Sequence, residues 1–450
     1  MNRTVRLLKE YIEGTIFEGK VFVAGGAVRD FLMGKESKDI DLLVDLPDGG
    51  LKFARHMSNT LKSKYVEFQR YGVGVFAIEG VDVECVMPRI ERYDKNSRHP
   101  EVKYCTVIED VKRRDFTINS LLWDITNEKV IDLTKQGVID LKHKIIRTVG
   151  HSTERFKEDP LRILRSIRFF SKLSEFDLCP DTRKGIQDTV SMLRYISSER
   201  IREELYQILI GNRVKQAFKL MEDLGILKVI LPEFHKLASM TQNKHHHETV
   251  LYHSLSVVEK CEKDSITRLC ALFHDIGKLV TRTEEDGKVK FLQHHKEGAP
   301  LAEQILRRLK VDNNTIKIVT LVIKNHMKLK QAGPKGTLIS DKALRKFILS
   351  CEEELDRVLS VIDADNKSHA PDSNLPIQIS SIRERIDSLE LSIKNKDIEL
   401  PIDGVDLMVF CGLKPGPEIG RLLGIVREEV LQNPNLTKEQ AFAILKEHLT

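Results

Sequence analysis

The first 150 residues alternate between short apolar runs and amphipathic stretches. The run Val21 to Ala24 is β-branched and apolar, so it predicts a buried strand that stops at the glycine pair Gly25 and Gly26. This alternation predicts a small mixed sheet with helices packed on it. Further strands are expected at Gly72 to Ile78 and Val81 to Val86, and helices at Val5 to Ile12 and Leu51 to Lys62.

One stretch of this first region departs from the pattern. Residues 89–104, RIERYDKNSRHPEVKY, are polar and basic and include Pro100, which predicts a mobile loop. From about residue 150 the apolar positions follow helical spacing. The chain is therefore expected to mix strands and helices at its start and to be helical afterwards.

Composition limits the class of protein. A chain of 450 residues has room for about two to four domains, and 41% hydrophobic with 31% charged residues is ordinary for a soluble globular protein. No apolar run approaches a membrane span, and the opening MNRTVRLLKEYIEG predicts an amphipathic helix rather than a signal peptide. Seven cysteines without CxxC spacing favour reduced thiols. We therefore expect a cytoplasmic protein, and the net charge of +5 permits an RNA partner without requiring one.

The glycine pair and the strand that follows it carry the first candidate chemistry. Gly25 and Gly26 let the backbone approach a ligand closely, and the helix after them would turn its first amides toward a phosphate, with Arg29 nearby. Asp39 and Asp41 lie two apart in a predicted strand, so they share one face and would repel each other without a cation. Mg²⁺ is held by such carboxylates together with substrate phosphates. Paired ions of this kind can activate a hydroxyl and stabilise a departing pyrophosphate.

A third carboxylate is expected on a neighbouring strand. In the run GVDVECV, Asp82 and Glu84 again share one strand face. Either residue could complete the metal site, although surface hairpins show the same alternation. The sequence leaves the choice between them open.

The segment KRRDFTINSLLWD, residues 112–124, adds positive charge. Arg113 and Arg114 could neutralise a triphosphate, with Asp115 holding one guanidinium through a bidentate pair. The alternative is a charged helix start, in which Asp115 and Thr117 act as a cap.

A further pair suggests base recognition. Asp159 and Arg162 are three residues apart, so they are expected on one helix face, and Arg165 and Arg168 continue the stripe. Adenine and cytosine present an amino donor beside a ring-nitrogen acceptor, whereas guanine and uracil present a carbonyl beside an N–H. A carboxylate only accepts and a guanidinium only donates, so this pair matches A and C and clashes with G and U. The alternative is a solvated or phosphate-binding face.

Histidines and aspartates form another constellation later in the chain. His253, the adjacent His274 and Asp275, and Asp365 follow the H...HD...D order of an HD phosphohydrolase domain, with Asp363 as a rival for Asp365. Imidazole with carboxylate suits Mn²⁺, Ni²⁺ or Fe²⁺ and, more weakly, Mg²⁺. His294, or its neighbour His295, and His326 stand where members with two metal ions carry additional ligands, whereas His245 to His247 are expected in a loop.

Taken together, these motifs resemble one family. Gly-Gly-x-Val-Arg-Asp followed by Asp-x-Asp resembles the head domain of class II tRNA nucleotidyltransferases and bacterial poly(A) polymerases, of the polymerase-β superfamily. RRDFTIN, Glu158-Asp159-x-x-Arg162 and ISSERIREEL resemble its later elements. The resemblance implies that Arg114 contacts the nucleotide and that Asp159 and Arg162 select the base. It also implies that Arg165 and Arg168 face triphosphate or primer, and that Glu199 and Arg200 brace the base-reading helix.

The resemblance also implies an architecture. It predicts an α+β fold with a polymerase-β-like head at residues 1–149 and a helical neck at 150–235. An HD metal-binding domain at 236–370 and a helical tRNA-contacting region at 371–450 would follow.

The implied activity is template-independent addition of C, C and A to tRNA 3′ ends. CTP, ATP and Mg²⁺ would be used and pyrophosphate released. The stretch 89–104 stands where the family has the loop for switching from C to A addition, which favours complete CCA synthesis. The alternatives are a poly(A) polymerase, a CC- or A-adding enzyme, or a protein whose main activity is HD phosphodiester or phosphate hydrolysis. The oligomeric state, monomer or homodimer, stays open.

Overall fold

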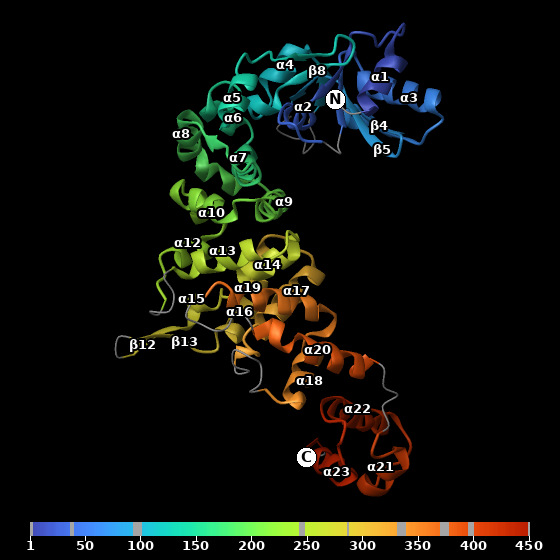
Figure 1. The fold of residues 1–450 in the computed structure, drawn as a ribbon, viewed down its shortest axis with the longest axis vertical. Coiled ribbons are helices and arrows are strands. Elements are labelled where there is room, and N and C mark those ends of the chain that lie inside the picture. The colour runs from blue at the N-terminus through green and yellow to red at the C-terminus, as the bar shows by residue number, and fades with distance from the viewer. Residues whose placement is uncertain are drawn as a thin grey trace. The chain divides into compact units, whose positions relative to one another are not determined.

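A computed structural model describes residues 3–36, 40–92, 101–242, 248–285, 288–330, 339–369, 378–394 and 400–448. The chain divides into two compact units, Met1–Ile230 and Leu231–Thr450 (Figure 1). Each unit is considered by itself. The finer division into four regions stays a prediction.

A seven-stranded mixed sheet organises the first unit. Its order is β3-β4-β5-β2-β1-β8-β9, in which β2 and β5 run parallel and the other neighbours are antiparallel. Helices α1 (Arg3–Ile12) and α3 (Gly49–Leu61) bury Leu8, Phe53 and Met57 in its core. The sheet thereby confirms the expected mixed α and β start of the chain. Its strands are β1 (Val21–Ala24), β2 (Ile40–Val44), β3 (Tyr65–Phe68), β4 (Val73–Ile78), β5 (Val81–Val86), β8 (Leu122–Asp124) and β9 (Lys129–Ile131).

The predicted loop at 89–104 is partly wrong. Its two ends, β6 (Arg89–Arg92) and β7 (Glu101–Tyr104), pair as an antiparallel hairpin, and residues 93–100 lie outside the described part. Strand pairing satisfies backbone groups whatever the polarity of the side chains, so the charged composition does not prevent it. Shorter elements complete the head: α2 (Gly26–Leu32), α4 (Val107–Lys112), α5 (Gly137–His143) and the 3-10 turns η1 (Gln69–Tyr71) and η2 (Thr117–Asn119).

Helices make up the rest of the first unit, apart from the short parallel pair β10 (Ile145–Ile146) and β11 (Asp177–Leu178). Helix α7 buries Ile163, Leu164 and Ile167 and packs against α9 and α10. Its arginines lie on its other sides, because a helix repeats about every 3.6 residues. The helices are α6 (Ser152–Glu158), α7 (Leu161–Lys172), α8 (Pro180–Thr189), α9 (Ser198–Leu209), α10 (Val214–Asp223) and α11 (Ile226–Ile230), with the 3-10 turn η3 (Val190–Tyr195).

The second unit is mainly helical. Helix α14 packs against α13, α17 and α19, and the hairpin of β12 (Arg282–Glu285) and β13 (Lys288–Phe291) leads into α16. The central helices are α12 (Pro232–Ala238), α13 (Val250–Lys260), α14 (Ser265–Phe273), α15 (Lys278–Thr281), α16 (His294–Arg308), α17 (Asn313–Asn325), α18 (Asp341–Ser350), α19 (Leu355–Asn366) and α20 (Gln378–Lys394), with η5 (Glu352–Glu354). The last three are α21 (Gly404–Cys411), α22 (Pro417–Gln432) and α23 (Lys438–His448). Among the described helices, none is long and apolar enough to cross a membrane.

Candidate functional site

The first unit contains an open cavity of about 500 Å³ that gathers most of the predicted head and neck residues. Its walls come from the turn after β1 with the start of α2, from β2, from the segment between α4 and β8, from Asp159 between α6 and α7, and from α7 and α9. The lining residues are Gly25, Gly26, Arg29, Asp41, Arg114, Asp115, Asn119, Asp159, Leu161, Arg162, Arg165, Phe169 and Arg200.

The glycine turn forms one wall as predicted. Gly25 has φ 67°, a left-handed conformation that favours glycine, and it leads directly into α2. Arg29 is only 4% exposed, and its Nη1 donates to Asn119 Oδ1 at 2.6 Å while the guanidinium pairs with Asp30. The cation beside the turn is therefore held in one orientation.

Asp41 brings a carboxylate to the same cavity. It is the exposed residue of β2, flanked by buried Ile40 and Leu42. Asp39 lies outside the described residues. In the parallel register of β2 and β5, Asp41 is paired with Glu84, so their side chains share a face of the sheet. The register favours Glu84 over Asp82 as the carboxylate beside Asp41.

The arginine held by Asp115 differs from the predicted one. Arg165 from α7 donates to Asp115 Oδ2 through Nε at 2.8 Å and Nη2 at 2.5 Å, whereas Arg114 pairs with Asp110 at 3.1 Å. Arg114 and Asp110 are four residues apart, about one helical turn, so their side chains are within reach of each other. Burial alone would raise the pKa of Asp115, but the charge and hydrogen bonds of Arg165 hold this pKa below its usual range. Asp115 thus ties the segment before η2 to helix α7.

Asp159 and Arg162 both line the cavity, but the expectation that they share one helix is wrong. Helix α6 ends at Glu158 and α7 begins at Leu161, with Asp159 extended between them. Pro160 explains the break, because a residue before proline is disfavoured in helical conformation.

Both members of this pair are fixed by neighbours. Arg162 Nη2 donates to the Arg113 carbonyl at 2.7 Å, and Arg200 Nη2 donates to Asp159 Oδ2 at 3.1 Å. Arg200 therefore braces Asp159 itself. Glu158 accepts from Arg162 at 3.2 Å.

Arg168 is placed differently from the other arginines of its stripe. It is not among the residues that line the cavity, and its Nη1 lies 3.1 Å from Glu204 Oε1. Burial raises the pKa of Glu204, and the charge of Arg168 opposes that rise. Arg168 therefore fits a role in supporting α7 better than a direct contact with triphosphate.

Phe169 lines the cavity, although the sequence analysis did not single it out. The guanidinium carbons of Arg29, Arg165 and Arg168 lie 5.4, 6.0 and 4.9 Å from its ring centroid. The sequence indicates this position, because Phe169 follows Arg165 by four residues and therefore lies on the same helix face. The Phe169 ring attracts the three guanidinium groups and shields them in part from water.

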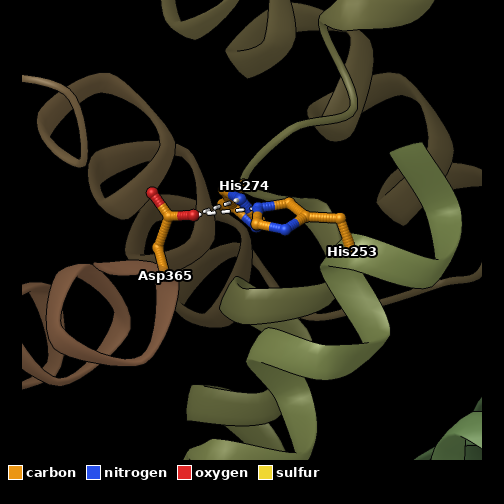
Figure 2. A group of neighbouring side chains, drawn as sticks. All are labelled: His253, His274 and Asp365. Atoms are coloured by element: carbon orange, nitrogen blue, oxygen red, sulfur yellow. Dashed lines mark hydrogen bonds and ion pairs between the residues drawn. The ribbon is translucent and has the colours of Figure 1, made fainter. Parts of the chain in front are cut away.

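The second unit gathers the predicted histidines and aspartates into one buried cluster. His253 Nε2 lies 2.9 Å from Asp365 Oδ1, and His274 Nε2 lies 3.8 Å from the same atom (Figure 2). Asp275 Oδ1 lies 3.2 Å from His294 Nε2. Two groups could hold a metal ion, one of His253, His274 and Asp365 and one of Asp275, His294 and His326.

The geometry separates the alternatives that the sequence left open. Asp363 pairs with Lys367 at 2.6 Å on α19, whereas Asp365 faces the histidines. His294 belongs to the cluster and His295 does not. Residues 245–247 lie outside the described part.

The charges around both carboxylates of this cluster lower their pKa. Burial would raise the pKa of Asp275, but His274 and Lys278 hold it well below its usual range. The pKa of Asp365 is likewise held low against its burial, by Lys330 and His253. Ionised carboxylates beside imidazoles are a suitable ligand set for a divalent transition metal.

Gly277 gives the cluster its close packing. A Cβ at this position would lie 2.0 Å from the His294 carbonyl oxygen and 2.7 Å from Gly298 N. With φ at −65°, the requirement for glycine is one of space and not of backbone conformation. The absence of a side chain lets the Asp275 segment lie against the start of α16.

Replacing Gly277 with alanine is expected to destabilise the second unit by about 1–3 kcal/mol, since the contacts are with backbone atoms that cannot move aside cheaply. Scanning calorimetry of the full chain would show a lower transition temperature. Gly424→Ala is the control, because nothing lies within 4 Å of its built Cβ in α22. Equal transition temperatures for the two variants would contradict this packing argument.

Three sequence families match the chain. Residues 21–147 match the poly A polymerase head domain, residues 175–237 the RNA- and SrmB-binding site of polymerase A, and residues 281–445 the second domain of tRNA nucleotidyltransferases. The first match spans the strands and the turn that carry Gly25 and Asp41.

Named relatives extend over nearly the whole chain. It is 30% identical over 420 residues to the CCA-adding enzyme of Lactobacillus helveticus, covering 92% of this chain and 89% of that one. It is 29% identical to the CC-adding tRNA nucleotidyltransferase of Thermus thermophilus, covering 94% and 92%. The A-adding tRNA nucleotidyltransferase of Deinococcus radiodurans is 27% identical, covering 90% of each chain.

A solved structure supports the fold. The Bacillus stearothermophilus CCA-adding enzyme in complex with CTP matches with a TM-score of 0.69 at 23% identity, covering 100% of this chain and 98% of that one. The predicted α+β class with its polymerase-β-like head is thereby confirmed. The chain belongs to the tRNA nucleotidyltransferase family of CCA-adding enzymes.

Proposed function

We propose that this protein adds nucleotides from CTP and ATP to tRNA 3′ ends without a nucleic-acid template, releasing pyrophosphate. The observation that carries the proposal is the single cavity into which the glycine turn, Asp41 and the Asp159–Arg162 pair all open. Relatives named as CC-adding, A-adding and CCA-adding support the reaction.

Asp39 and Asp41 would hold Mg²⁺, with Glu84 as the third carboxylate. The exposed Asp41 beside Glu84 fits an ion that is held by protein carboxylates and substrate phosphates. The ion would lower the pKa of the primer 3′-hydroxyl and neutralise charge in the in-line transition state. Gly25 and Gly26 would let the triphosphate approach the backbone, and Arg29 and Arg114 would balance its charge.

Asp159 and Arg162 would select the base. The carboxylate would accept from the amino group of cytosine or adenine, and the guanidinium would donate to the acceptor beside it. Because Arg200 and the Arg113 carbonyl already fix both side chains, the pair is preorganised before the nucleotide arrives. Arg165, held by Asp115, would face the triphosphate or the primer end.

The proposed product is the complete CCA end. The alternative products are a partial end, CC or A alone, and a poly(A) tail, since the head residues are compatible with each.

The test is pyrophosphate release from a tRNA transcript that lacks CCA, with each nucleotide supplied separately. Release with CTP, or with ATP after prior CTP, but not with UTP or GTP, is expected. Equal release with all four would overturn the proposal.

A second function is favoured by the cluster in the second unit. We propose that His253, His274, Asp275 and Asp365 hold a divalent ion of an HD site that hydrolyses phosphate esters of nucleotides or RNA ends. The buried group of His253, His274 and Asp365, with the buried Asp275 carboxylate 3.2 Å from His274 Nε2, supports the assignment. His274→Ala should abolish the hydrolysis of 2′,3′-cyclic nucleotides to nucleoside monophosphates and spare nucleotide addition. Hydrolysis at an unchanged rate would refute the metal assignment.

The proposed location is the cytoplasm. All seven cysteines are free, and six of them are buried. Free thiols are typical of reducing compartments, where tRNA processing also takes place.

A further inference from the structure

The face of the sheet that carries Asp41 continues across the next strands as a row of side chains. In the strand register, Asp41 pairs with Glu84, Glu84 with Val75, and Val75 with Val66. Paired residues of neighbouring strands point to the same side, so the row crosses β2, β5, β4 and β3. It begins with two carboxylates and ends with two valines on the side of β3, which is an edge strand of the sheet.

A second row lies beside the first on the same face. Leu43 pairs with Val86, Val86 with Val73, and Val73 with Phe68. At the β2 end of this row, Leu43 and Val86 pack in a small core with Val111 of α4. At the β3 end, Phe68 is 50% exposed. The second row is therefore packed against a helix at one end and open to solvent at the other.

Together, Val66, Phe68, Val73 and Val75 form an apolar surface that we call the β3–β4 patch. Val66 is 53% exposed, and Val73 and Val75 are half-buried. A sheet face that meets water usually carries polar side chains. The core of the sheet does not need these four residues, because β4 buries Phe76 there from its other face. An exposed apolar patch of this kind marks an interaction site.

The position of the patch indicates what it binds. Three strand spacings, about 14 Å, separate Asp41 from Val66. In the proposed reaction the terminal 3′-hydroxyl of the primer lies at Asp41 and Glu84, so the nucleotides behind it must cross a neighbouring part of the surface. The β3–β4 patch adjoins these carboxylates on their own face of the sheet. A permanent protein cover would lie against the reacting groups, whereas an RNA end leaves with the product.

The chemistry of the patch also fits single-stranded RNA. The faces of unpaired bases are apolar and stack on aromatic rings, which Phe68 provides. Phosphates need cations instead, and both Lys64, just before β3, and Arg70, just after it, are exposed. The carboxylate of Glu84 repels phosphates from the inner side of the patch. Bases are therefore expected over the patch and the RNA backbone toward its outer edge.

We propose that the β3–β4 patch is the platform on which the unpaired 3′ end of the tRNA lies during addition, with Phe68 stacked on the penultimate base. The inference rests on the proposed nucleotide addition and adds the residues that hold the primer. Stacking tolerates any base, because every base has an apolar face. An end that changes its sequence with each added nucleotide requires such tolerance.

The test uses a tRNA transcript that ends in the discriminator base followed by one C, with 2-aminopurine as the discriminator base. The fluorescence of 2-aminopurine falls when it stacks, so the full chain should quench it without any nucleotide present. Phe68→Ala should bind this transcript about tenfold more weakly and lose most of the quenching. Phe68→Leu, which keeps apolar area without the ring, should also lose the quenching, and Phe68→Tyr should keep it. Ile16→Ala is the matched control, an exposed apolar residue of the same unit outside the patch.

Incorporation of CTP into the same transcript gives a second readout. Phe68→Ala should raise the KM for tRNA about tenfold and leave the KM for CTP and the kcat at saturating tRNA within about twofold, because the ring contacts the primer and not the nucleotide. A general loss of structure would lower kcat as well. Circular dichroism shows whether each variant is folded.

The outcomes separate the platform from the proposed function. Incorporation by Phe68→Ala with parental tRNA affinity and quenching would overturn the platform and leave the function standing. Quenching that depends on Phe68, without incorporation of any nucleotide, would support the platform and refute the function. A parent that sediments as a dimer, with a monomeric Phe68→Ala of unchanged tRNA affinity, would assign the patch to a second copy and overturn the inference.

Discussion

Replacing Asp41 with asparagine is expected to lower the kcat of nucleotide addition by on the order of 10³-fold, because a neutral amide cannot hold the ion that balances transition-state charge. The fold should persist, since Asp41 is the exposed residue of an otherwise buried strand. Single-turnover incorporation of CTP into a tRNA transcript, at saturating enzyme, measures the chemical step directly.

On β5, Glu84 provides a second test of the metal site and Asp82 its matched control. Glu84 is paired with Asp41 in the register and Asp82 is not, although both are exposed and share one strand face. Glu84→Gln should lower the rate by on the order of 100-fold, whereas Asp82→Asn should stay within a few fold of the parent. An Asp41→Asn protein that adds nucleotides at the parental rate would exclude the proposed mechanism.

The second large effect is expected on base choice. Asp159→Ala removes the acceptor for the amino group of cytosine and adenine, and a hydrogen bond to a charged group is worth about 1.5–3 kcal/mol. The kcat/KM for CTP should therefore fall by about 10- to 100-fold, while that for UTP should not fall, because its carbonyl no longer faces a carboxylate. Arg162→Ala should also lower the ratio of kcat/KM for CTP to kcat/KM for UTP.

Competition between CTP and UTP in one reaction gives this ratio directly. Lys157→Ala is the control, an exposed residue of α6 that does not line the cavity. If Asp159→Ala keeps the parental ratio of CTP to UTP incorporation, other residues of the cavity must select the base. Arg200→Ala, which frees Asp159 from its brace, should give a smaller change of the same sign.

Local signals in the sequence predicted the framework of the first unit. The apolar run before Gly25, the amphipathic α2 and the strand β2 with Asp41 as its one charged residue are each set by residues next to one another in the chain. Pro160 indicates a helix break at Asp159, whereas the three-residue spacing of Asp159, Arg162 and the arginines that follow predicts one continuous helix. The two-residue gap changes the direction in which Asp159 points and places it within reach of Arg200.

Contacts between distant segments could not be predicted in the same way. Asp115 and Arg165 are 50 residues apart, and only the packing of α7 against the head shows that they pair. In the second unit the order of histidines and aspartates predicted the residues that gather in the buried cluster. The choice of His294 over His295 depends on the direction in which α16 starts, because neighbouring helical side chains point about 100° apart.

The most direct test of the central claim is primer extension on a tRNA transcript that ends at the discriminator base, with CTP alone, ATP alone and both. We expect growth by two nucleotides with CTP, none with ATP, and growth by three followed by arrest with both. A long ladder with ATP alone would indicate a poly(A) polymerase. No extension under any condition would contradict the proposed function.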